Sequence, residues 1–73
     1  MSVGENIRRI REEKKMSQEA LAEKAGVTQA MISHIEKGIR IPSFLVAVEI
    51  AKALECKTEE FLAEGEISRN VKR

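Results

Sequence analysis

The 73-residue sequence predicts one compact all-α domain of five short helices. Apolar residues recur at helical spacing through most of the chain, and no stretch alternates convincingly with period two. A Ser or Thr precedes each periodic segment, where its side-chain oxygen can accept an unpaired backbone N–H. Gly26, Gly38 and Pro42 fall between those segments. A chain of this length supports one small core.

The first helix is expected to open at Ser2. Glu5, three residues later, completes a capping box, in which each residue's side chain pairs with the other's backbone N–H. Lys14 and Lys15 stand near the negative end of the helix, where cations are favourable. Its apolar stripe consists of Val3, Ile7 and Ile10.

The second and third helices are expected to be joined by one tight turn. Ser17 and Thr28 are placed to cap them, and Gly26 falls where the second helix must stop in a left-handed conformation. Ala22 is small enough to let another helix cross closely. The residues expected to face inward are Leu21, Ala22, Ala25, Val27, Ile32 and Ile35. This pattern is a helix-turn-helix, a unit that places its second helix in the DNA major groove.

Two further helices are expected after an extended connection over residues 39–42, because Pro42 disfavours a helical residue before it. Ser43 caps the fourth helix, and Thr58 caps a short fifth helix that carries Phe61 and Leu62. The expected inner face of the fourth helix is Phe44, Ala47, Val48, Ile50, Ala51 and Leu54. Residues 1–64 therefore form the predicted domain, and 65–73 a flexible or partner-engaged tail.

The charge balance is nearly even, with 13 Lys and Arg against 12 Asp and Glu. A DNA-binding domain usually carries a clear basic excess. Here acidic residues concentrate over 49–66, whereas Lys37, Arg40 and residues 69–73 are locally basic. This segregation can leave one positive face with modest non-specific affinity for DNA.

The residue types present disfavour several other functions. Two Phe, no Tyr and no Trp argue against a base-stacking reader of RNA or single strands. One histidine and one cysteine do not suggest a metal site, and no nucleophile–base pair or phosphate-binding loop suggests an enzyme. We expect no cofactor, no small-molecule ligand and no membrane partner. Cys56 is expected to fill an apolar hole, and the chain to be cytoplasmic, nucleoid-associated, and prokaryotic or phage-derived.

The spacing of these residues resembles that of the Cro/phage-repressor (Xre-type) family of helix-turn-helix domains. The matching motifs are Ile7-Arg8-x-x-Arg11, Ser17-Gln18-Glu19-x-Leu21-Ala22, Ala25-Gly26-Val27-Thr28, Ile32-Ser33-x-Ile35-Glu36-x-Gly38 and Arg40-x-Pro42-Ser43. The resemblance runs from about residue 4 to residue 62 and implies a lambda-repressor-like DNA-binding domain. Glu55 departs from it, because the family often has glycine after the fourth helix.

The resemblance implies which residues would contact DNA. The base-reading positions are Gln29, Ala30, Ser33 and His34. The phosphate-contacting positions are Gln18, Thr28, Lys37 and Arg40. Glutamine can pair with both N6 and N7 of adenine, and an alanine methyl can meet a thymine methyl. The alternatives are an ordinary first-turn glutamine and a solvated histidine.

The resemblance also implies one structural contact, and Leu45 and Val46, which depart from the family pattern because polar residues are commoner there, suggest another. Arg11 and Glu36 would form an ion pair that orients the recognition helix; the alternative is a pair of solvated charges. Leu45, Val46 and Phe61 would contribute to a two-fold dimer surface; the alternative is isolated surface apolar residues, which are common.

The predicted function is sequence-specific binding of double-stranded DNA by a transcriptional regulator. A homodimer would place its third helices in two half-sites about 34 Å apart on a pseudo-palindromic operator. A regulatory protein partner is a further expectation. The alternative is a protein-interaction module of the same fold that has lost DNA binding, favoured by the near-neutral charge and by Leu45 and Val46.

Overall fold

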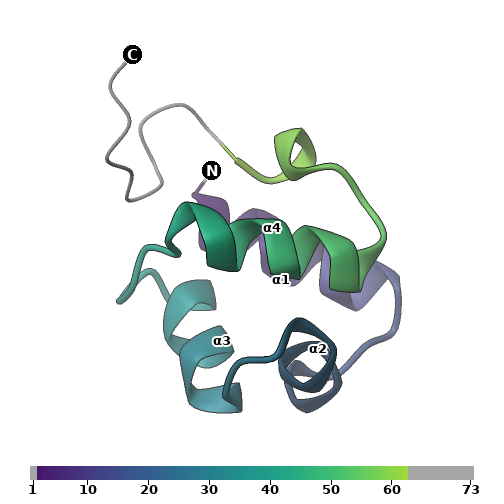
Figure 1. Ribbon diagram of the computed structural model, residues 1–73, viewed down its shortest axis with the longest axis horizontal. Coiled ribbons are helices and arrows are strands. Elements are labelled where there is room, and N and C mark those ends of the chain that lie inside the picture. The colour runs from purple at the N-terminus through teal and green to yellow at the C-terminus, as the bar shows by residue number, and fades with distance from the viewer. Residues whose placement is uncertain (1, 63–73) are drawn as a thin grey trace.

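The computed structural model of the protein describes residues 2–62, which form four α-helices and one 3₁₀ turn (Figure 1). The tail expected over 65–73 lies outside the described residues. The elements are α1 (Val3–Glu13), α2 (Gln18–Ala25), α3 (Gln29–Glu36), α4 (Phe44–Leu54) and η1 (Thr58–Glu60). The all-α prediction is confirmed, but the count of five α-helices is wrong.

The helices enclose one small core. α2 packs against both α3 and α4, while α1 packs against α3. Figure 1 shows α2 and α3 below α4, with the short turn between them at the edge of the molecule. The largest fully buried side chains come from all four helices and from the end of the described chain: Ile7, Leu21, Ile32, Ile35, Ile50, Leu54 and Phe61.

All four α-helices begin at the predicted capping residues. Each capping oxygen accepts the backbone N–H three residues later, at 3.0–3.2 Å, and the capping residues are Ser2, Ser17, Thr28 and Ser43. The predicted capping box is present, because Glu5 also accepts the backbone N–H of Ser2. Local side-chain chemistry therefore defines where each helix starts.

The expected fifth helix is only the 3₁₀ turn η1. Lys57 occupies the position before it, and Thr58 is its first residue instead of its cap. One turn is too short to be stable alone, so packing must hold it. Phe61 is 0% exposed, and its carbonyl accepts a 3.4 Å hydrogen bond from Nδ2 of Asn6, which fastens this end of the chain to α1.

Phe44 does not lie on the inner face of α4 as expected, because its side chain is 56% exposed. Helical side chains tilt toward the N-terminus. The side chain of the first residue therefore points past the end of the helix, beyond the neighbours that cover later turns. The buried residues of α4 are Ala47, Ile50, Ala51, Ala53 and Leu54, and Val48 is half-buried.

The exit from α4 is a left-handed residue that is not glycine. Glu55 caps the helix at φ 58° and ψ 46°, so its backbone follows the geometry in which glycine is favoured. A side chain in this conformation costs roughly 1–2 kcal/mol.

We expect Glu55→Gly to raise the free energy of unfolding by about 0.5–1 kcal/mol, because relief of this strain exceeds the added entropy of the unfolded chain. Urea unfolding followed by circular dichroism measures the change. Glu49→Gly, inside α4, is the matched control and should destabilise the protein by a similar amount. If Glu55→Gly lowered the free energy of unfolding instead, Glu55 would not be strained at this position.

Candidate nucleic-acid interface

The centre of the candidate interface is the turn between α2 and α3. Gly26 ends α2 at φ 75°, and the backbone N–H of Val27 donates to the carbonyl of Ala22 at 3.0 Å. Two residues after Gly26, Thr28 caps α3. The chain thus leaves one helix and enters the next within three residues. The two helices pack directly against each other, as a helix-turn-helix requires.

The four predicted base-reading residues share the outer side of α3. Gln29, Ala30 and His34 are exposed and Ser33 is half-exposed, whereas Ile32 and Ile35 point into the core. Within residues 2–62, no hydrogen bond or ion pair engages the side chains of Gln29, Ser33 or His34. The face therefore offers polar groups that are free to meet an external partner.

Two cations flank this face at the end of α3. Lys37 caps the helix, and Gly38 follows at φ 81°. The backbone N–H groups of Ile39 and Arg40 both donate to the carbonyl of His34, at 2.9 and 3.2 Å, which folds the connection back onto α3. Among the described contacts, neither Lys37 nor Arg40 has an anionic partner.

Arg11 and Glu36 form a buried bidentate ion pair between α1 and α3. Nε of Arg11 lies 2.7 Å from one carboxylate oxygen of Glu36, and Nη2 lies 3.0 Å from the other. The residues are only 9% and 7% exposed. Hydrogen bonding to Glu36 raises the pKa of Arg11 above its ordinary value. The contact with Glu36 therefore favours the charged form of the guanidinium.

Gln18 has a partner that the sequence did not reveal. Its Nε2 donates to Oε1 of Glu36 at 2.9 Å, so the first residue of α2 is tied to the last residue of α3. Thr28 is exposed and its hydroxyl oxygen caps α3. Gln18 and Glu36 are 18 residues apart in sequence, and no local motif predicts their contact.

The three residues expected at a dimer surface have different surroundings. Leu45 is 69% exposed, and Val46 is half-buried against the core. Phe61 is fully buried, so its side chain cannot contact a partner, and its assignment to a dimer surface is wrong. Its aromatic ring instead closes the core beside α1 and α4, where burial is more favourable than exposure.

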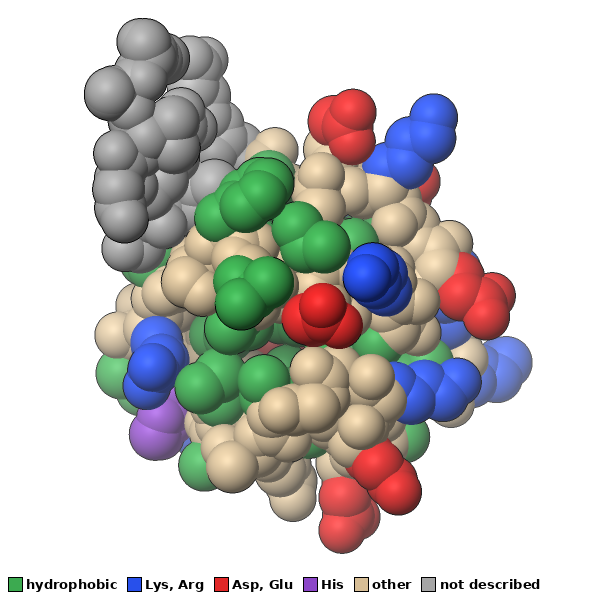
Figure 2. Space-filling view, in the orientation of Figure 1, with side chains coloured by type: hydrophobic (Ala, Val, Ile, Leu, Met, Phe, Trp, Pro, Cys, Tyr) green, Lys and Arg blue, Asp and Glu red, His purple; other side chains and the backbone are tan. Residues whose placement is uncertain are grey.

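An apolar patch, which we define as Ile39, Ile41, Phe44 and Leu45, covers the α3–α4 connection and the start of α4. All four side chains are more than half exposed. Figure 2 shows hydrophobic side chains gathered over this part of the molecule. Of these four residues, the sequence pattern predicts only Leu45 at a surface.

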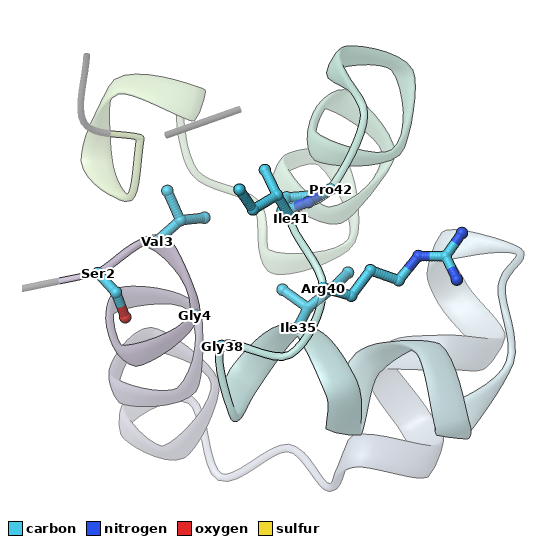
Figure 3. A pocket seen from close by; sticks show the side chains of 8 residues that line it. All are labelled: Ser2, Val3, Gly4, Ile35, Gly38, Arg40, Ile41 and Pro42. Carbon is cyan, nitrogen blue, oxygen red and sulfur yellow. The ribbon is translucent and has the colours of Figure 1, made fainter. Parts of the chain in front are cut away.

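A groove lies beside the apolar patch, between the start of α1 and the residues that follow α3 (Figure 3). Its volume is about 240 Å³, and Val3, Ile35, Ile41 and Pro42 supply most of its apolar lining. The side chain of Arg40 extends away from the groove, which separates the cation from the apolar surface. The end of α3 therefore carries two surfaces, one charged and one apolar.

Cys56 is half-buried against the core, in agreement with its expected place. Burial raises the pKa of its thiol, and the nearby Glu60 raises it further, whereas Lys14 opposes them. A thiol whose ionisation is suppressed is a weak nucleophile.

The fold and this face define a helix-turn-helix protein, and comparison with known proteins places it in a family. The helix-turn-helix family HTH_3 matches residues 7–61, and the chain belongs to that family. The chain is 48% identical over 44 residues to the HTH-type transcriptional regulator YgzD of Bacillus subtilis, covering 60% of this chain and 67% of YgzD. It is 34% identical over 64 residues to the immunity repressor of Bacillus phage phi105, covering 88% of this chain but 44% of the repressor.

Solved structures share the same architecture. The P22 c2 repressor, determined in complex with a synthetic operator, superposes with a TM-score of 0.80 at 32% identity, covering 85% of this chain and 94% of that one. The restriction-modification controller protein C.AhdI of Aeromonas hydrophila has a TM-score of 0.80 at 30% identity, covering 82% and 91%. SinR, determined in complex with DNA, has a TM-score of 0.74 at 33% identity, covering 78% and 92%.

Residues 2–62 contain neither a membrane-spanning helix nor a metal-binding cluster. None of their helices is long and apolar enough to cross a membrane. The same residues hold no group of three His, Cys, Asp or Glu side chains placed to bind a metal ion.

Proposed function

We propose that this protein regulates transcription by inserting α3 into the major groove of double-stranded DNA. It is a DNA-binding transcriptional regulator of the helix-turn-helix family, a family of regulators and not of enzymes. The observation that carries the proposal is the unengaged polar face of α3 with Lys37 and Arg40 at its end. DNA-bound structures of P22 c2 repressor and SinR support it. As part of the same proposal, the protein would work in the cytoplasm, associated with the nucleoid.

We assign roles by the chemistry of each side chain. Gln29, Ala30, Ser33 and His34 would meet base edges. Thr28, Lys37, Arg40 and Gln18 would meet phosphates, which position the protein without reading sequence.

We expect Gln29→Ala to weaken binding to the preferred site by about 5- to 150-fold and to relax selectivity at one base pair, because one bidentate contact is worth about 1–3 kcal/mol. The preferred site comes from selection on random duplexes, and fluorescence anisotropy measures the affinity. Lys37→Ala should weaken all duplexes alike and lower the salt slope by about one. Lys52→Ala, on α4, is the control for loss of one surface charge. A Gln29→Ala protein with unchanged affinity and selectivity would contradict the assignment.

The alternative is an interaction module of this fold without DNA binding, favoured by the net charge of +1 and by the apolar patch. The same selection separates the two. Enrichment of a duplex whose affinity falls steeply with salt supports DNA binding. Absence of any enriched duplex at low salt would support the module.

The regulator is proposed to act as a homodimer through the apolar patch. The patch directly follows α3 in the chain but is separate from the polar face of that helix, so a second copy could bind the patch without covering the polar face. Dimers of phage repressors read two half-sites about 34 Å apart. Single exposed apolar residues are common on protein surfaces, but the apolar patch gathers four large ones. Contiguous exposed apolar patches typically mark interaction sites.

We expect the protein without DNA to sediment as a dimer, and Leu45→Glu to sediment as a monomer, because a charge would be buried unpaired in the interface. Sedimentation equilibrium measures both. Lys24→Glu, at the exposed end of α2, is the control and should stay dimeric. A single-chain mass for the unsubstituted protein at all concentrations would contradict the dimer.

A further inference from the structure

The buried ion pair reaches the candidate DNA surface through one side chain. Glu36 accepts hydrogen bonds from Arg11 on one side and from Nε2 of Gln18 on the other. The same guanidinium donates from Nη1 to the carbonyl of Met16 at 2.7 Å. Met16 directly precedes Ser17, the cap of α2. Arg11 therefore fixes both the end of α3 and the backbone at the start of α2.

The contact with Glu36 sets the orientation of the Gln18 amide. A carboxylate only accepts hydrogen bonds, so Gln18 must turn its amino group, and not its carbonyl, toward Glu36. That group has two hydrogens, and Glu36 takes one. Within residues 2–62 no bond uses the second, which remains available for another acceptor. Gln18 is thus held as a donor instead of rotating freely.

Arg11 has a second effect, on charge. An uncompensated carboxylate beside the start of α2 would repel a phosphate. The guanidinium, bound to both oxygens of Glu36, neutralises that charge at 2.7–3.0 Å. Glu36 can therefore hold Gln18 without driving an anion away from it.

We propose that Glu36, neutralised by Arg11, is a positioning residue for DNA binding, which holds the side-chain amide of Gln18 against a DNA phosphate. The inference rests on the proposed function. It assigns the ion pair an effect on DNA affinity that is separate from its effect on folding, and Gln18 transmits that effect.

A double-mutant cycle tests the inference on the selected duplex. Gln18→Met removes the amide, and Arg11→Met with Glu36→Leu replaces the pair by apolar side chains without changing net charge. We expect each change alone to weaken binding about tenfold, and the two together to weaken it about tenfold, not hundredfold. Arg40→Ala lies outside this network and is the control. Its fold-loss in DNA affinity should multiply with the fold-loss caused by the pair replacement.

Glu36→Gln is the conservative variant, since it keeps a side-chain oxygen for Gln18. In that background Gln18→Met should still cost about tenfold, whereas in the background of the pair replacement it should cost nothing. A merely structural role for the pair would not produce this difference. Multiplicative losses of Gln18→Met and the pair replacement would overturn the inference.

Amide resonances of the unsubstituted protein give a second measurement, which remains valid if the pair replacement does not fold. We expect the two Nε2 protons of Gln18 to give separate signals and both to shift when the duplex is added. Unshifted signals in a protein that binds DNA would overturn this inference alone. Failure of the unsubstituted protein to bind any duplex would overturn the proposed function, and this inference with it.

Discussion

Replacing Arg11 by Met is expected to lower the free energy of unfolding by about 3–5 kcal/mol. The loss arises because the substitution leaves the carboxylate of Glu36 buried without its guanidinium partner, while the Glu36 side chain is only 3% exposed. The carbonyl of Met16 also loses its 2.7 Å donor. A small domain has a stability of about 5 kcal/mol in total, so this variant should be close to unfolding.

Urea unfolding followed by circular dichroism measures the effect. Arg8→Met is the matched control, because Arg8 pairs with Glu12 on the exposed surface of the same helix at 3.1 Å. An exposed pair of this kind contributes at most about 1 kcal/mol. If both variants lost the same free energy of unfolding, burial would not explain the contribution of the Arg11–Glu36 pair.

The helix starts and the turn are predictable from the sequence because their causes are local. A capping oxygen acts three residues along the chain, and the left-handed residue at Gly26 needs no distant neighbour. These features place α2 and α3, and with them the outward face of α3. The outward face of α3 can therefore be predicted from the amino-acid sequence alone, whereas the choice of base-reading residues on that face rests on the family resemblance.

The two phenylalanines show where such reasoning stops. Helical spacing predicts Phe44 inside, and the expected dimer surface includes Phe61, but the structure reverses both. Each lies at the end of an element, where helical spacing does not determine burial and only tertiary neighbours do. The Gln18–Glu36 contact depends in the same way on how α2 meets α3, so no spacing rule could predict it.

Gly4→Ala is expected to destabilise the protein by about 3 kcal/mol, although helix propensity alone predicts a gain of about 1 kcal/mol. An added Cβ at this position would overlap the backbone carbonyl oxygen of Ile35 and would approach Cα of Glu36 to 3.0 Å. Both are backbone atoms at the end of α3, so neither can rotate away as a side chain would. The absence of a Cβ lets α1 lie this close to α3.

Arg11 lies on α1 and Glu36 on α3, so their ion pair also depends on how closely these two helices pack. Thermal unfolding of Gly4→Ala measures the destabilisation. Gly26→Ala is the control: its added Cβ would meet nothing within 4 Å, so only the cost of φ 75°, about 1–2 kcal/mol, should appear. If Gly4→Ala were as stable as the unsubstituted protein, α1 would have to move away from α3. The close packing of α1 on α3 at Gly4 would then not be needed for the 2.7 Å contact of Arg11 with Glu36. The hydrogen bond from Gln18 to Glu36 would not depend on it either.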